Sequence, residues 1–193
     1  MKLKTSDLLS LEQYDKQRAS IKKEIISHKQ NRTISIGDNI VLIFEDFITI
    51  KYQVQEMLRI EKIFIENEIQ EEIDAYNPLI PDGNNLKATM LIMFPDVEER
   101  KIMLFKLHDI ENKIWISFGS EKIFAHADED LDRSTDEKTS AVHFLRFQFS
   151  EEQITDFLSS QDIELGVEHP EYRKKVKLNS YTRSNLVGDL SSN

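Results

Sequence analysis

The sequence predicts an α+β protein with a mostly antiparallel sheet, a long N-terminal helix and an inserted helix pair. Short alternating apolar segments occur in pairs around turn-rich residues such as Gly37-Asp38-Asn39, which favours antiparallel hairpins. Helical patterns interrupt these pairs as separate insertions and do not alternate with single strands, so a parallel sheet is not expected. No internal repeat is visible.

Composition places the chain among ordinary globular proteins. It has 193 residues, of which 39% are hydrophobic and 31% charged, so we expect a single domain over residues 1–193 with a core of its own. Cysteine is absent, which excludes disulfides, thiolate ligands for an iron–sulfur cluster and a cysteine nucleophile. Any iron–sulfur cluster would belong to a partner.

The formal net charge of −10 is unevenly distributed. Residues 1–32 carry eight Lys/Arg against four Asp/Glu, so the remaining chain is strongly acidic. An acidic body argues against nucleic-acid binding, which needs a basic surface. No apolar stretch approaches a membrane span, and MKLKTSDLLSLEQ lacks the apolar segment of a secretory signal. We therefore expect a cytoplasmic protein without membrane association.

The first helix is predicted over residues 11–29. Ser10 and Gln13 have the spacing of a capping box, which marks its start. Apolar and long side chains recur every three or four residues along it: Leu11, Tyr14, Arg18, Ile21, Ile25 and His28. This narrow stripe predicts packing against the rest of the domain, with Arg18 either extended to solvent or paired. The alternative is a homo-oligomer that uses this stripe as its interface.

The remaining elements follow from periodicity and turn residues. Expected strands cover residues 32–36, 40–44, 86–94, 113–118, 121–126, 139–149 and 163–168; expected helices cover 47–65, 66–76, 97–107 and 151–159. Ser150 and Gln153 form a second capping box, and Asn77-Pro78 ends the inserted helix pair. We expect residues 128–138 to form a mobile loop and residues 184–193 to be a frayed tail.

The inserted helix pair carries the densest set of polar side chains. Tyr52, Gln55, Glu56 and Arg59 share one side of the first helix of the pair, at spacings that permit contact. They could form a structural network that holds the helices together. They could also form a pocket wall in which Arg59 binds an anion and Glu56 orients it, since a planar guanidinium matches carboxylate or phosphate. Glu45, Gln53 and Asn77 could line the same pocket.

Glu61 is the exception on the apolar side of the same helix. A buried carboxylate must be paired, hydrogen-bonded, metal-bound or protonated. Because the two helices are joined within one or two residues, Glu72 of the second helix could approach Glu61 in a partly apolar setting. The sequence therefore suggests a carboxylate-rich pocket.

Histidine offers a third partner for such a pocket. His143 lies on the apolar face of the strand predicted at 139–149. It is either a hydrogen-bonded core histidine or a metal ligand or general base that works with Glu61 or Glu72. The metal set suggested by the sequence is thus Glu61, Glu72 and His143.

Most motifs that identify enzymes are absent, including GxGxxG, GxxxxGK[ST], HExxH, GxSxG and the ExxH signature of di-iron bundles. Whether the protein is an enzyme is therefore left open, and no cofactor is assigned.

The chain resembles a bacterial family catalogued as domain of unknown function 3501. The residues that carry the resemblance are Phe44-Glu45, Tyr52-Gln53, Gln55-Glu56-Met57, Arg59, Glu61, Tyr76-Asn77-Pro78-Leu79-Ile80-Pro81, Ala88-Thr89, Ala141-Val142-His143, Arg146-Phe147, His169-Pro170 and Tyr172. The resemblance implies a genomic neighbourhood that includes a rubrerythrin-like di-iron protein and an iron–sulfur oxidoreductase. It supplies no activity that could be transferred.

Two functional readings follow. The first is an accessory or interaction protein of an iron-dependent redox or oxidative-stress system, with a rubrerythrin-like or iron–sulfur protein as its partner. The alternative is a small-molecule-binding protein or metal-dependent enzyme that uses the carboxylate-rich pocket.

Overall fold

Two antiparallel sheets and six α-helices make up the protein in the computed structural model, which describes residues 2–127 and 139–191. The first sheet has the order β1 (Thr33–Ile36), β2 (Ile40–Phe44), β3 (Asn85–Ile92), β7 (Val142–Gln148) and β6 (His126–Ala127). The second has the order β5 (Glu121–Phe124), β4 (Ile114–Phe118), β8 (Ile163–His169) and β9 (Tyr172–Lys177). The α+β class is confirmed, although the strands form two sheets where the sequence suggested one.

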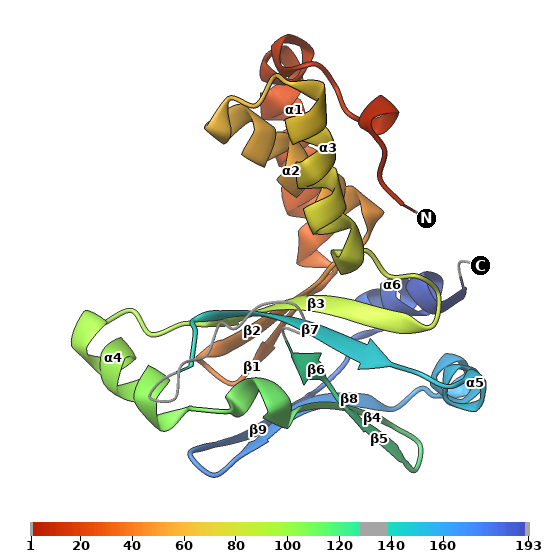
Figure 1. Ribbon diagram of the computed structural model, residues 1–193. Coiled ribbons are helices and arrows are strands. Elements are labelled where there is room, and N and C mark those ends of the chain that lie inside the picture. The colour runs from red at the N-terminus through yellow and green to blue at the C-terminus, as the bar shows by residue number, and fades with distance from the viewer. Residues whose placement is uncertain (1, 128–138, 192–193) are drawn as a thin grey trace.

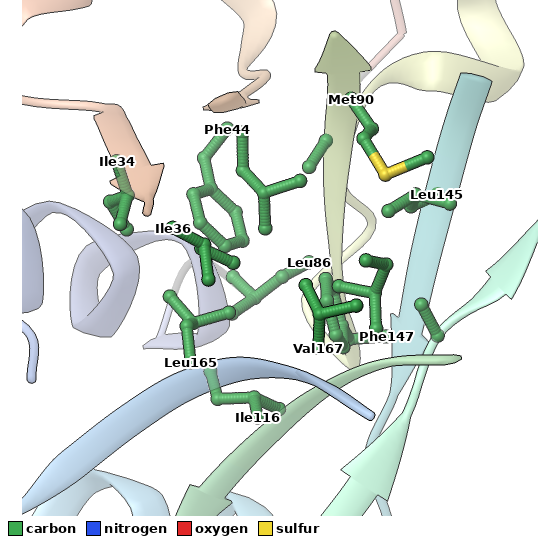
Figure 2. Packing of buried hydrophobic residues seen from close by; sticks show 14 of the residues in the cluster. Ile34, Ile36, Phe44, Leu86, Met90, Ile116, Leu145, Phe147, Leu165 and Val167 are labelled. Atoms are coloured by element: carbon green, nitrogen blue, oxygen red, sulfur yellow. The ribbon is translucent and has the colours of Figure 1, made fainter. Parts of the chain in front are cut away.

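The main core lies between the two sheets (Figure 2). Strict alternation along β2 buries Ile40, Leu42 and Phe44, since successive side chains point to opposite faces of a strand. The second sheet faces them with Ile114, Ile116, Phe118, Ile163, Leu165 and Val167. The inward face of each sheet is therefore buried against the other.

A helical arm stands on the first sheet, well away from the second (Figure 1). It consists of α1 (Leu11–Gln30), α2 (Phe47–Glu61) and α3 (Glu66–Tyr76). The arm has a small apolar core of its own, formed by Leu3, Ile50, Val54, Leu58, Ile73 and Ile80. Because α2 leaves β2 and α3 returns to β3, the α2–α3 turn lies at the far end of the arm (Figure 1).

Short elements complete the chain. They are the 3-10 helices η1 (Thr5–Asp7), η2 (Asn77–Leu79) and η3 (Ile110–Lys113), together with α4 (Val97–Lys106), α5 (Glu151–Ser159) and α6 (Ser180–Ser191). The Asn77 side chain accepts a hydrogen bond from Leu3 N at 2.8 Å and donates one to Leu3 O at 3.1 Å. The N-terminal segment is thereby attached to the end of the arm that lies nearest the sheet.

Both predicted capping boxes are present. Ser10 and Gln13 exchange side-chain and backbone hydrogen bonds at the start of α1, and Ser150 and Gln153 do so at the start of α5. A third cap begins α2, where Asp46 accepts from Thr49 N at 2.8 Å.

The expected helix over residues 47–65 ends earlier, at Glu61. Lys62 adopts a left-handed conformation with φ 56°, and Ile63 N donates to Leu58 O at 3.0 Å, which closes the helix end. The turn reverses the chain so that Ile63 and Ile69 pack on the arm core. The sequence predicted a longer helix because the apolar residues of the turn happen to follow the helical spacing.

The C-terminal segment differs more from expectation. Residues 184–191, expected to fray, lie in α6, where Leu186 and Leu190 are buried in the main core. Asn179 accepts a hydrogen bond from Thr182 N at 2.9 Å near the start of this helix. Residues 172–177 form β9, an edge strand of the second sheet. The loop expected at 128–138 lies outside the described residues.

Gly166 of β8 makes room for the indole of Trp115 on the outer face of the second sheet. A Cβ added at Gly166 would overlap the Trp115 ring. We expect Gly166→Ala to lower the free energy of unfolding by about 2 kcal/mol, the usual cost of overpacking. Urea denaturation followed by far-UV circular dichroism would measure it.

Gly188→Ala provides the matched control. A Cβ there meets nothing within 4 Å, and alanine favours a helix, so stability should rise by about 0.5–1 kcal/mol. Equal stability of Gly166→Ala and the wild type would show that the Trp115 contact is easily rearranged.

Candidate functional site

The polar side of α2 forms a network centred on Glu56. The Arg18 guanidinium binds this carboxylate through two nitrogens, Nε to Oε1 at 2.7 Å and Nη2 to Oε2 at 2.8 Å. The Tyr14 hydroxyl donates to Oε1 at 2.7 Å, and Arg59 Nη2 lies 3.3 Å from Oε2. The predicted Glu56–Arg59 pair is therefore present, but the stronger partner is Arg18 of α1. Such paired bonds from one guanidinium are among the strongest polar contacts in proteins.

This network shifts the pKa values of its members. The hydrogen bonds from Arg18, together with those from Tyr14 and Arg59, lower the pKa of Glu56 to about 2 against the opposing effect of burial. Burial raises the pKa of Tyr14, and its bond to Glu56 adds to the rise. Burial likewise raises the pKa of Tyr52, with the negative charge of Glu56 contributing. Glu56 is thus a fixed anion whose lone pairs are used within the arm.

Gln55 attaches the chain before α1 to α2. Its Oε1 accepts from Leu9 N at 2.9 Å, and its Nε2 donates to Leu9 O at 3.1 Å. The side chain is buried, so these bonds replace those it would make to water. Gln53 is half-buried on the same helix. Gln55 and Glu56 therefore connect α2 to α1 and to the chain before it.

A second polar network lies where the arm meets the sheet. The buried Arg32 contacts both Asp46 and Asp189; its Nε is 3.3 Å from Asp46 Oδ2 and donates to Phe44 O at 3.2 Å. Burial, and the nearby charge of Asp46, raise the pKa of Asp189 to about 7, although Arg32 acts in the opposite direction. The C-terminal helix α6 is thereby connected to the start of α2.

His28 extends this network toward the arm. Its Nε2 lies 2.6 Å from Asp46 Oδ2 and must carry a proton, because a carboxylate only accepts. Glu45, next to Asp46, is also buried and accepts from Thr89 Oγ1 at 2.6 Å. Its other oxygen has no hydrogen-bond partner among the described residues.

The suggested carboxylate pocket does not assemble. Glu61 is exposed at the end of α2, which corrects the expectation that it lies on a buried apolar side. Glu72 is half-buried, and burial together with the charge of Glu61 raises its pKa. The two carboxylates are therefore neighbours, as expected, but at the surface of the arm.

His143 lies in the sheet body. Its Nε2 is 2.8 Å from Thr139 Oγ1, 3.1 Å from Ser140 O and 3.8 Å from Glu111 Oε2, and Thr139 donates to Glu111 at 2.8 Å. His143 is fully buried, so it matches the core-histidine reading. Its carboxylate neighbour is Glu111 rather than Glu61 or Glu72. Within residues 2–127 and 139–191, no group of three His, Asp or Glu side chains is placed to hold a metal.

The far end of the arm presents apolar side chains to solvent. Ile60, Phe64 and Ile65 are 58%, 72% and 61% exposed. We call this surface the apolar tip. The segment that carries it is acidic, since residues 61–72 include five glutamates and one lysine. Clustered apolar side chains within a polar surround are typical of protein–protein contact sites.

A groove of about 490 Å³ runs along the side of the arm between α1 and α2. Its apolar lining comes from Leu9, Ile21, Ile25, Phe47 and Ile48, and its polar lining comes from Tyr14, Glu24, His28, Lys51, Tyr52 and Gln55. We call it the α1–α2 groove.

Comparison with known proteins identifies the family. A family model described as "Protein of unknown function (DUF3501)" matches residues 2–190. The chain belongs to this family. The DUF3501 protein is also similar to a solved structure described as a novel protein of unknown function from Burkholderia pseudomallei. The two are 43% identical, with a TM-score of 0.93, and the alignment covers 98% of this chain and 100% of the other. No curated protein matches the chain.

The DUF3501 chain contains functional candidates that sequence reasoning missed. His28 and Asp189 lie in two helices, Arg32 and Asp46 lie in connecting segments, and no local spacing connects the four. Asp46 alone had a signal, because Asp46 and Thr49 have the spacing of a helix cap. A membrane-spanning segment was not expected, and none of the helices in the described ranges has the length and apolar character to cross a bilayer.

Proposed function

We propose that this DUF3501 protein is an accessory protein that binds another protein through the apolar tip of its arm. The observation that carries the proposal is the exposure of Ile60, Phe64 and Ile65 together at the end of a projecting element. Burying such side chains against a partner would remove apolar area from water, which favours association. Glu56 and Arg59 pair with each other inside the arm, so we assign this pair a structural role and do not place it in the partner surface.

The charge around the tip restricts the partner. The segment that carries the apolar side chains also contains Glu61, Glu66, Glu68, Glu71 and Glu72. A matching surface would therefore have an apolar centre bordered by Lys or Arg, because opposite potentials guide association and exclude wrong partners.

We further propose that the partner belongs to an iron-dependent redox or oxidative-stress system. Support comes from the neighbourhood implied by the family resemblance, in which a rubrerythrin-like protein and an iron–sulfur oxidoreductase are encoded nearby. The absence of cysteine supports the same view, because any thiolate-bound cluster must come from the partner.

Co-expression of the full chain with each of these two proteins from the same bacterium tests the proposal. Affinity purification should recover a partner with the wild type, and Phe64→Asp should lower recovery at least tenfold because a charge replaces an apolar contact. Ile102→Asp is the matched control, since Ile102 is 57% exposed on α4, outside the arm. Recovery of neither partner, or equal losses with both variants, would contradict the proposal. Light scattering would show whether the tip joins two copies instead.

A metal-dependent enzyme built on Glu61, Glu72 and His143 receives no comparable support. Those side chains lie in the arm and in the sheet core, so one ion could not bind them together without a rearrangement of the fold.

A further inference from the structure

The α1–α2 groove has the size and lining of a small-molecule site. Its volume of about 490 Å³ falls within the range of roughly 300–1,000 Å³ that is typical of ligand pockets. It is separate from the apolar tip, so a ligand there would be a property beyond the proposed partner binding. Measured along α1 from Tyr14 to His28, the groove extends over on the order of 20 Å. This shape suits an elongated molecule.

Helix periodicity explains how the lining forms. Lys51 and Tyr52 each lie three or four residues from Ile48 and from Gln55, so the four side chains project from one side of α2. Tyr14, Ile21, Ile25 and His28 project from the facing side of α1. The stripe predicted for the first helix is thus partly buried against α2 and partly lines the groove.

Most polar groups in the lining already have partners within the protein. Gln55 is bonded to Leu9, the Tyr14 hydroxyl to Glu56, and His28 Nε2 to Asp46. Glu24 is exposed and accepts from Ser20 Oγ at 3.0 Å. These groups shape the groove and leave little capacity for a ligand.

Lys51 and Tyr52 are different. Across the described part of the chain, the Lys51 ammonium makes no ion pair, and the Tyr52 hydroxyl makes no hydrogen bond, although both residues are half-buried in the lining. One supplies a positive charge and the other a hydroxyl donor, next to an apolar channel. A carboxylate accepts from both kinds of donor.

The geometry points to a binding site in the α1–α2 groove for an elongated apolar molecule that carries one carboxylate, with Lys51 and Tyr52 holding the carboxylate and Ile21, Ile25 and Phe47 contacting the apolar part. The apolar contacts supply most of the affinity, and the Lys51 charge selects an anion over a cation or a neutral head group.

Titration calorimetry with three probes of equal chain length tests the assignment: decanoate, decylammonium and decanol, all below micelle-forming concentrations. Decanoate should bind the full-length protein at least tenfold more tightly than decylammonium. Amide chemical-shift changes should fall on the facing sides of α1 and α2.

Variants then test the head-group contact. Lys51→Met should weaken decanoate binding about tenfold and remove its advantage over decanol, whereas Lys51→Arg should retain it. Lys23→Met is the matched control, because Lys23 is exposed on α1 outside the groove and its loss should change nothing. Absence of binding by all three probes, equal affinity for decylammonium, shift changes elsewhere, or equal effects of Lys51→Met and Lys23→Met would each overturn the assignment. None of these results depends on the partner tests at the tip.

Discussion

Replacing Arg32 with methionine is expected to lower the free energy of unfolding by about 3–5 kcal/mol, the range measured when one member of a buried ion pair is removed. Arg32 is 1% exposed and is among the largest fully buried side chains. Methionine has similar length but no donors, so Asp46 and Asp189 would keep their buried positions without a compensating charge. Chemical denaturation at pH 7 measures the loss.

Asp189→Asn is the matched control for Arg32→Met. Because burial raises the pKa of Asp189 to about 7, this carboxyl is already partly uncharged in the folded protein at neutral pH. A neutral amide of the same shape should therefore cost no more than about 1 kcal/mol. If the two substitutions cost the same, the carboxylates do not depend on Arg32 in the way the geometry indicates.

Glu56→Gln is expected to destabilise the protein by about 2 kcal/mol at pH 7, because Arg18 and Arg59 lose a charged acceptor. The effect should depend on pH. The pKa of Glu56 is about 2 in the folded protein, below the ordinary glutamate value of 4.5. The carboxylate therefore contributes its full stabilisation above about pH 4.5 and loses it as the pH falls toward 2.

Urea denaturation of the wild type and Glu56→Gln at several pH values between 7 and 2.5 would follow this change. The two unfolding free energies should converge as the pH falls. Glu61→Gln is the matched control, since it makes the same substitution five residues along the same helix at an exposed position. It should change stability by less than about 0.5 kcal/mol. A difference between wild type and Glu56→Gln that stays constant across the series would show that the carboxylate charge is not the cause.

Most of the local structure could be predicted from the sequence. Ser10 with Gln13 and Ser150 with Gln153 located two helix starts, because a capping box satisfies backbone donors within four residues. Periodicity and turn residues located β2 and β4. The predicted end of α2 was wrong because Lys62 adopts a left-handed conformation, which the spacing of the apolar residues does not reveal.

The contacts within the candidate sites were harder to predict from the sequence. Sequence spacing correctly predicted contact between Glu56 and Arg59, which are three residues apart. The dominant partner of Glu56 is Arg18, 38 residues earlier, and Arg32 contacts Asp189, 157 residues later. Glu61 was expected to be buried from its helical position alone. The chain reversal after it places the side chain in solvent.

By itself, the sequence determined the α+β class, the positions of most helices and strands, and the family to which the chain belongs. These features depend on interactions among residues close together in the chain, or on composition. Only the tertiary structure decided which charges pair, which apolar side chains remain exposed at the end of the arm, and that α1 and α2 enclose a groove. Those outcomes depend on how distant segments pack, and each polar or apolar side chain had several possible partners until packing brought one of them within contact distance.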